Sequence, residues 1–204
     1  MNLKVCGMKY KKNINEVSNL KPNFMGFIFW PETSRYFNSE KIDIPNNIFK
    51  VGVFVNQSFE IIKEKIYKFN LDYVQLHGDE KVHICKKLNQ ITKIIKVFRV
   101  GENIDFNKIT PYENYCDYFL FDTEGKKYGG SGKKFNWKIL RNYKSKKPFF
   151  LSGGIDLNDF NELKKIFKLD IPFFGIDINS RFEIKPGLKD DKKIKELIEK
   201  IKNE

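Results

Sequence analysis

Short apolar runs alternate with helical patterns along the whole chain, and this alternation constrains the fold more than any other feature. Segments with helical spacing of apolar residues lie within 59–69, 82–88, 160–167 and 194–201. Strands that alternate with helices typically form a parallel sheet, so the sequence predicts an α/β fold. The apolar runs that we interpret as its strands are Leu3–Val5, Met25–Phe29, Phe49–Val55, Tyr73–Leu76, Ile94–Phe98, Tyr118–Phe121, Phe149–Leu151 and Phe173–Ile176.

Eight such units predict a closed parallel (βα)8 barrel, or TIM barrel, built as one domain over residues 1–204. Dividing 204 residues by eight leaves about 25 for each unit, near the lower limit for this fold, so some helices must be short. Pro111 interrupts segment 100–116 and restricts any helix there to a turn or two. An open doubly wound sheet is the main alternative, but no G-x-G-x-x-G motif follows the first strand.

In a barrel of this kind, the residues at the carboxyl ends of the strands share one rim, where active sites form. The predicted strand ends carry side chains of several reactive types, including a thiol, carboxylates, arginines and a histidine. Such a collection predicts an enzyme active site at this rim. The residues concerned are Cys6, Arg35, Asn56, His77, Arg99, Asp122, Ser152, Asp177, Asn179 and Ser180.

A long polar loop rich in glycine follows Asp122. Glycine allows the backbone to approach a ligand closely, so we expect the loop to contact substrate through Gly129 and Gly130. A carboxylate beside such a loop is typical of catalysis in α/β enzymes. The alternative is an ordinary surface loop beside a solvated aspartate.

Two further loops predict a phosphate site. Gly153 and Gly154 follow the seventh predicted strand, and Asp177–Ser180 follow the eighth. Loops in these positions often bind phosphate through backbone N–H groups and a helix N-terminus, which here begins near Asp156. Outside a barrel, the same glycines would be ordinary turns.

Cysteine and histidine spacing argues against a bound metal. The three cysteines are odd in number, and no pair of them has the spacing of metal ligands; His77 and His83 match no common zinc pattern. We therefore expect reduced thiols, a cytoplasmic location and no cofactor or metal. Cys85 and Cys116 are expected in the core. Cys6 can act as a nucleophile or base if positive charge lowers its pKa.

The net charge of +12 would suit either a nucleic-acid binder or an enzyme for anionic substrates. The lysines are spread along the chain without an arginine-rich cluster, which favours a small anionic substrate over nucleic acid. No apolar run approaches the ~20 residues of a membrane span. The start of the chain, with Lys4 and Lys9, does not look like a signal peptide.

Together these motifs resemble the phosphoribosylanthranilate isomerase family of tryptophan biosynthesis. The resemblance covers the whole chain, in order, and departs from the family pattern at a few positions, among them Arg181 where a small residue is expected. The similar segments are Lys4–Lys9, Gly26–Phe29 with Ser34–Arg35, Val74–Gly78, Phe121–Asp122 with Gly129–Gly132, Leu151–Gly154 and Asp177–Asp190.

The resemblance implies an Amadori rearrangement that converts N-(5-phosphoribosyl)anthranilate to 1-(2-carboxyphenylamino)-1-deoxyribulose 5-phosphate. It assigns the general acid to Asp122, the general base to Cys6 and the substrate carboxylate to Arg35. Two alternatives remain: a barrel related to indole-glycerol-phosphate synthase, in which Lys4 or Lys96 would be the catalytic lysine, and a non-catalytic basic binding module. The oligomeric state, monomer or homodimer, is left open.

Overall fold

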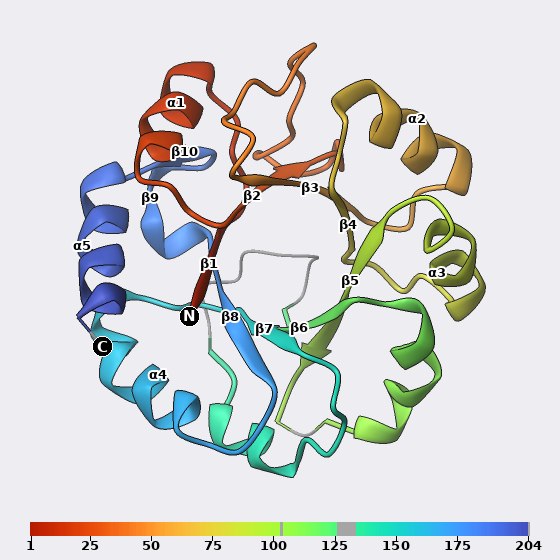
Figure 1. Ribbon diagram of the computed structural model, residues 1–204, viewed down its shortest axis with the longest axis vertical. Coiled ribbons are helices and arrows are strands. Elements are labelled where there is room, and N and C mark those ends of the chain that lie inside the picture. The colour runs from red at the N-terminus through yellow and green to blue at the C-terminus, as the bar shows by residue number, and fades with distance from the viewer. Residues whose placement is uncertain (103, 126–133, 204) are drawn as a thin grey trace.

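The computed structural model describes residues 1–102, 104–125 and 134–203, and its eight parallel strands close into a barrel (Figure 1). Each strand pairs with the next one along the chain, and the first pairs with the eighth. The predicted (βα)8 barrel is confirmed, and an open sheet is excluded. The strands are β1 (Asn2–Val5), β2 (Phe24–Ile28), β3 (Phe49–Phe54), β4 (Tyr73–Leu76), β5 (Lys93–Val100), β6 (Tyr118–Thr123), β7 (Phe149–Leu151) and β8 (Phe173–Ile178).

Helices surround the barrel on its outside (Figure 1). The α-helices are α1 (Lys11–Asn19), α2 (Phe59–Phe69), α3 (Val82–Leu88), α4 (Phe160–Phe167) and α5 (Asp191–Lys202). Short 3-10 helices complete the remaining units, at Phe106–Lys108, Thr110–Tyr115, Trp137–Asn142, Leu157–Asp159 and Ser180–Phe182. The two within 100–116 confirm that this segment forms only short helical turns. Helix α1 was not predicted, because two of its four buried residues are the polar Asn13 and Ser18.

Aromatic side chains fill the amino-terminal half of the barrel interior. Phe24, Tyr73 and Phe150 belong to one buried cluster there, and the rings of Phe24 and Phe150 meet edge to face with centroids 5.3 Å apart. Tyr118 and Phe174 close the cluster, with ring centroids 4.3 Å apart. These large rings belong to the first or second residues of their strands and fill the barrel interior at this end. Polar side chains concentrate at the opposite, carboxyl end.

A two-stranded antiparallel hairpin follows β8 and was not predicted. It consists of β9 (Glu183–Lys185) and β10 (Leu188–Lys189). Buried Asn13 of α1 fixes it to the barrel: Asn13 Nδ2 donates to the Lys189 carbonyl at 2.9 Å, and the Lys189 N–H donates to Asn13 Oδ1 at 2.7 Å. The first helix therefore holds the last hairpin beside the carboxyl ends of the strands.

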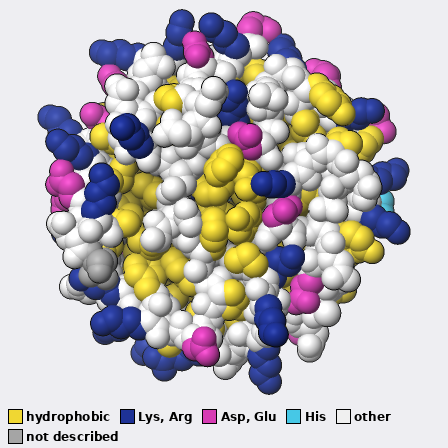
Figure 2. All heavy atoms as spheres, viewed as in Figure 1, with side chains coloured by type: hydrophobic (Ala, Val, Ile, Leu, Met, Phe, Trp, Pro, Cys, Tyr) yellow, Lys and Arg dark blue, Asp and Glu magenta, His cyan; other side chains and the backbone are white. Residues whose placement is uncertain are grey.

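Charges are interspersed over the molecular face shown in Figure 2. Lysine and arginine side chains alternate there with acidic ones around a central group of hydrophobic side chains. This face therefore carries no continuous basic stripe. Within the described ranges, no helix has the length and apolar character needed to cross a bilayer.

Candidate active site

One cavity opens at the carboxyl ends of the strands and brings most of the predicted site residues together. Its wall combines polar groups with an apolar side formed by Ile28, Trp30, Val53 and Val55. The predicted residues that line it are Cys6, Arg35, His77, Asp122, Gly153, Gly154, Asp177, Asn179 and Ser180. Gly129 and Gly130 lie outside the described residues.

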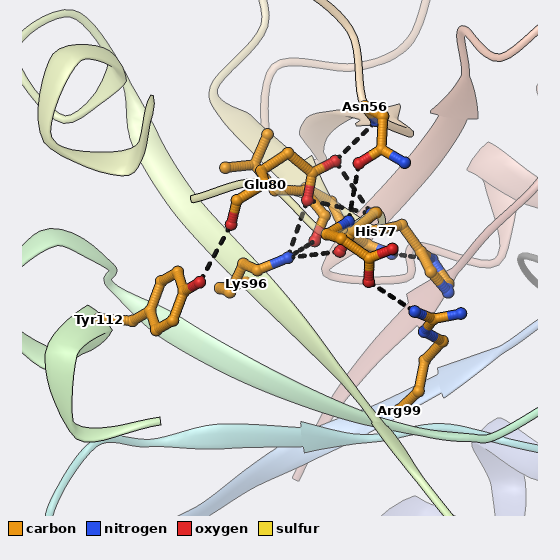
Figure 3. Close-up of polar contacts among 10 residues, drawn as sticks. Asn56, His77, Glu80, Lys96, Arg99 and Tyr112 are labelled. Atoms are coloured by element: carbon orange, nitrogen blue, oxygen red, sulfur yellow. Dashed lines mark hydrogen bonds and ion pairs between the residues drawn. The ribbon is translucent and has the colours of Figure 1, made fainter. Parts of the chain in front are cut away.

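Arg99 is not brought to this cavity, in contrast to its prediction as a substrate contact. It lies within β5, which runs to Val100, and its Nη2 pairs with Asp79 Oδ1 at 2.5 Å. Figure 3 shows the Arg99 side chain reaching toward the loop that follows β4. The predicted strand ended too early, and the guanidinium contacts a neighbouring loop instead of the cavity.

Cys6 directly follows β1 and lies beside a buried ion pair. Lys4 Nζ donates to Asp177 Oδ1 at 2.9 Å, and both side chains are almost fully buried. A Cβ atom on Gly26 would lie 2.8 Å from Cys6 Sγ and 3.2 Å from Lys4 Nζ, so only glycine leaves room for both groups. Burial lowers the Lys4 pKa, but the charges of Asp177 and Cys6 and the hydrogen bonds to both residues together outweigh it and raise the Lys4 pKa above its ordinary value.

The Cys6 thiol is protonated at rest, in contrast to the lowered pKa that would favour a base. Burial raises the pKa of Cys6, and the positive charges of Lys4 and Lys189 only partly offset this effect. The predicted positive environment is therefore present, but desolvation outweighs it. A group with positive charge that forms next to the thiol would favour its ionisation.

Asp122 lies near the end of β6, with His77 beside it. Asp122 Oδ2 is 3.2 Å from His77 Nε2, and Asp122 Oδ1 accepts from the Thr123 N–H at 2.9 Å. On its other side, His77 Nδ1 is 3.3 Å from the amide Nε2 of Gln75, which is fully buried. The imidazole therefore lies between a buried amide and the carboxylate at the cavity wall, although His77 Nε2 makes no hydrogen bond within the described residues.

A buried ion pair supports the loop that carries His77 (Figure 3). Lys96 Nζ donates to Glu80 Oε2 and to the Gly78 carbonyl, both at 2.8 Å, and to the Leu76 carbonyl at 3.3 Å. Glu80 Oε1 in turn accepts from the N–H groups of Asn56 and Gly78, each at 2.9 Å. Both termini of the loop are therefore held by one charged pair. The Lys96 amine therefore has a structural role, and Lys96 does not line the cavity.

Arg35 is held by an acidic residue of the β9–β10 hairpin. Arg35 Nε lies 2.9 Å from Glu183 Oε1, and Arg35 Nη2 lies 2.6 Å from Glu183 Oε2. Burial favours a higher pKa for Glu183, but the hydrogen bonds from Arg35 and the charge of Lys189 outweigh it and hold the pKa low. Gly7, at φ +75°, permits this approach, since a Cβ there would lie 3.0 Å from Arg35 Cδ.

The loops after β7 and β8 face each other across one end of the cavity. Gly153 and Gly154 both have positive φ, at +93° and +64°, and a Cβ on Gly153 would clash with Thr123. Asn179 and Ser180 lie opposite, where the 3-10 helix Ser180–Phe182 begins. Backbone N–H groups and small polar side chains of this kind suit a phosphate.

The helix predicted to begin near Asp156 offers fewer free N–H groups to this end of the cavity than expected. Its first turn is the 3-10 helix Leu157–Asp159, and α4 proper begins at Phe160. Asp156 and Asp159 form a reciprocal capping box, in which the Asp156 N–H donates to Asp159 Oδ2 at 2.7 Å. Their carboxylates satisfy N–H groups of the first turn, which leaves fewer of these groups available to a ligand.

Known proteins resemble this chain over almost its full length. Residues 3–200 match the family model described as N-(5'phosphoribosyl)anthranilate (PRA) isomerase. The chain belongs to that family. A curated member from Phocaeicola vulgatus is 43% identical over 203 residues, which cover 99% of this chain and 98% of the relative.

Solved structures of the family have the same fold. The phosphoribosyl anthranilate isomerase from Thermotoga maritima superimposes with a TM-score of 0.87 at 30% identity, covering 100% of both chains. A PRA isomerase in complex with reduced 1-(o-carboxyphenylamino)-1-deoxyribulose 5-phosphate superimposes with a TM-score of 0.83 at 26% identity, again covering 100% of both chains. The predicted family, and with it an isomerase of tryptophan biosynthesis, is confirmed. Neither the synthase-like barrel nor the binding module is supported.

Sequence reasoning missed several polar residues beside the cavity. Gln75 was predicted only as part of a strand, without a role in the site. Glu183 and Lys189 lie in a hairpin that the sequence pattern did not predict. Lys4 was considered only as a catalytic lysine, whereas the structure pairs it with Asp177. A lysine or glutamine within an otherwise apolar strand was the one available signal for Lys4, Gln75 and Lys96. In the described part of the chain, no group of three or more histidine, cysteine or acidic residues could hold a metal ion.

Proposed function

We propose that Cys6 and Asp122 carry out the Amadori rearrangement as general base and general acid. The observation that supports this assignment is that Cys6, which follows β1, and Asp122, in β6, line the same cavity as Arg35 and the two predicted phosphate loops. The substrate, N-(5-phosphoribosyl)anthranilate, carries a carboxylate at one end and a phosphate at the other. The cavity offers a group for each end, with the acid and the base between them.

The reaction begins with opening of the furanose ring. Asp122 donates a proton to the ring oxygen, the bond from that oxygen to C1 breaks, and the nitrogen lone pair forms a C1=N double bond. The resulting iminium is positively charged. His77, whose Nε2 lies 3.2 Å from Asp122 Oδ2, is placed to return a proton to the carboxylate afterwards.

Proton removal from C2 follows. Once the iminium has formed, the Cys6 thiol releases its own proton to solvent, and the resulting thiolate takes the proton from C2. The C–H electrons form a C1=C2 double bond, and the C=N electrons return to nitrogen. The iminium charge favours the thiolate at this stage, which offsets the raised pKa of the resting thiol. The enaminol then becomes the ketone by gaining a proton at C1 and losing one from the oxygen on C2, so the overall reaction neither consumes nor releases protons.

The remaining site residues bind and orient the substrate. Arg35 pairs with the anthranilate carboxylate, and the ring lies against the apolar wall that includes Trp30. Gly153–Gly154 and Asn179–Ser180 bind the phosphate, which supplies binding energy for positioning the ribose. Asp177, with Oδ1 held by Lys4, presents its other oxygen to a sugar hydroxyl.

A fluorescence assay tests the proposal. The fluorescence of the anthranilate adduct should decrease when the purified protein is added to N-(5-phosphoribosyl)anthranilate, and the product should be identified by mass and by its ketone chemistry. A Cys6→Ala/Asp122→Asn variant is the matched control for spontaneous breakdown. Loss of the adduct at the same rate with parent and variant would refute the assignment. We further propose a cytoplasmic enzyme that acts as a monomer or homodimer, which light scattering distinguishes.

A further inference from the structure

Arg35, Glu183 and Lys189 form a cluster of three charges at the edge of the cavity, which we call the carboxylate cluster. Glu183 lies between the two cations, and its side chain is only 3% exposed. Lys189 Nζ donates to Glu183 Oε1 at 2.7 Å and to Asn179 Oδ1 at 2.6 Å, and its side chain is fully buried. None of the roles proposed above uses Glu183 or Lys189.

The contacts of Arg35 occupy only one edge of its guanidinium group. All its side-chain hydrogen bonds within the described residues involve Nε and Nη2, and all go to Glu183. Arg35 lines the cavity, so the edge that carries Nη1 remains available to a ligand there. A guanidinium held along one edge has already lost much of its rotational freedom, which lowers the entropic cost of binding a carboxylate on the other edge.

Charge balance explains why a second cation is needed. Arg35 and Glu183 alone would be neutral as a pair, and Glu183 would repel a second carboxylate bound to the same guanidinium. Lys189 restores a net charge of +1 to the carboxylate cluster. Because Lys189 is buried and bonded to Glu183 and Asn179, its charge acts inside the site instead of being screened by solvent.

We propose that Glu183 and Lys189 are positioning residues that make Arg35 selective for a substrate carboxylate: Glu183 orients the guanidinium, and Lys189 cancels the charge of Glu183. This inference rests on the proposed function, in which Arg35 binds the anthranilate carboxylate. The hairpin is built for the task, since the Gly187 N–H also donates to Glu183 Oε1 at 2.9 Å and Asn13 fixes the backbone of Lys189.

Protonation of Lys189 gives the proposal a second, independent readout. Burial lowers the pKa of Lys189 to about 8, although the charge of Glu183 opposes this. The titratable and charged groups that face it are Glu183 from β9, the Cys6 thiol after β1 and Arg35 after β2. Above about pH 8, the carboxylate cluster loses its net positive charge, and carboxylate recognition should weaken.

The test uses two non-reacting probes and calorimetry. One probe is reduced 1-(o-carboxyphenylamino)-1-deoxyribulose 5-phosphate, and the other is the same compound without the carboxyl group. The ratio of their dissociation constants measures carboxylate recognition without requiring turnover. At pH 7 the parent should prefer the carboxylated probe by at least roughly tenfold, as expected for a charge-assisted pair.

The variants are Lys189→Met and, as a matched control, Lys185→Met, which changes an exposed lysine of the same hairpin. Lys189→Met should reduce the preference to within about threefold. An effect on phosphate binding through Asn179 weakens both probes equally and cancels in the ratio. Lys185→Met should keep the parent ratio. In the parent, the ratio should also fall between pH 7 and 9.5; this measurement needs no variant and holds even if Lys189→Met does not fold.

The outcomes separate this inference from the proposed function. A high parent ratio that a folded Lys189→Met protein retains would overturn the role of Lys189, as would a ratio that stays constant from pH 7 to 9.5. A parent ratio near one would instead refute carboxylate binding by Arg35 and, with it, both proposals. Absence of turnover in the fluorescence assay, together with a high ratio, would count against the acid–base assignment alone.

Discussion

Replacing Lys96 by methionine should destabilise the protein strongly, because it leaves a buried carboxylate without its cation. Lys96 and Glu80 have side chains that are 3% and 2% exposed. The substitution removes the ion pair and two hydrogen bonds to the carbonyls of Leu76 and Gly78. Breaking a buried pair at one partner typically costs about 3–5 kcal/mol. Glu80 keeps its bonds from the Asn56 and Gly78 N–H groups, so we expect a loss near 3 kcal/mol, at the lower end of that range.

Urea unfolding followed by tryptophan fluorescence measures this effect, with a double-mutant cycle to isolate the pair. For a chain of this length, a loss of about 3 kcal/mol lowers the Tm by roughly 6–12 °C. The double variant Lys96→Met/Glu80→Gln should recover about 2 kcal/mol relative to Lys96→Met, because no uncompensated charge remains. Lys93→Met, at the exposed start of the same strand, is the control and should cost less than about 1 kcal/mol. A loss below about 1 kcal/mol for Lys96→Met, or strictly additive effects in the double variant, would show that the charge is not the cause.

Four further outcomes are expected. Cys6→Ala and Asp122→Asn should each lower kcat by at least about 100-fold with little change in KM, measured by steady-state fluorescence; near-normal kcat in either would sink the acid–base assignment. Arg35→Lys should be less active than the parent, because lysine keeps the charge but lacks the planar guanidinium group. If Arg35→Ala lowers activity equally on substrates with and without the carboxylate, Arg35 does not recognise that carboxylate. Gly154→Val should raise KM at least roughly tenfold and weaken competition by sulfate, since a β-branched residue at φ +64° is strained and blocks approach to the backbone; unchanged sulfate inhibition would contradict it. Folding lowers the Lys189 pKa from 10.5 to about 8. Between these pH values the folded protein binds fewer protons than the unfolded chain. The free energy of unfolding should therefore increase by up to about 3 kcal/mol as pH rises from 8 to 10.5. Lys189→Met should lack this gain, and parallel urea curves for both proteins across that range would argue against it.

The strands were predictable because each contains a short, mostly apolar run, as is typical of a barrel strand buried on both faces. Their carboxyl ends were less predictable, since polar residues that point into the cavity still belong to the strand. Asp122 and Asp177 were placed after their strands, but the ladders of β6 and β8 extend to Thr123 and Ile178. Active-site polarity therefore hides the last residues of a strand from pattern analysis.

Long-range pairs were out of reach for a different reason. The contact between Arg35 and Glu183 spans 148 positions, and either residue alone resembles an ordinary surface charge. Only the fold shows that Arg35 lines the cavity and that buried Glu183 pairs with it. The direction of the Cys6 pKa shift was unexpected for a similar reason. Nearby positive charge could be anticipated from the sequence, but the degree of burial that raises the Cys6 pKa could not.

The bonds between Asn13 and Lys189 join residues that lie 176 positions apart, and this has a consequence for synthesis on the ribosome. Residues 177–189 must emerge before Asn13, Arg35 and Lys4 can meet Lys189, Glu183 and Asp177. Domains of this size fold during or soon after translation, and contacts of such long sequence separation form late. We therefore expect nascent chains arrested before residue 177 not to bind substrate, because they lack Asp177, Asn179 and Ser180 of the cavity wall. A ligand that binds this cavity would then distinguish nascent chains in which the loop after β8 has joined the barrel from those in which it has not.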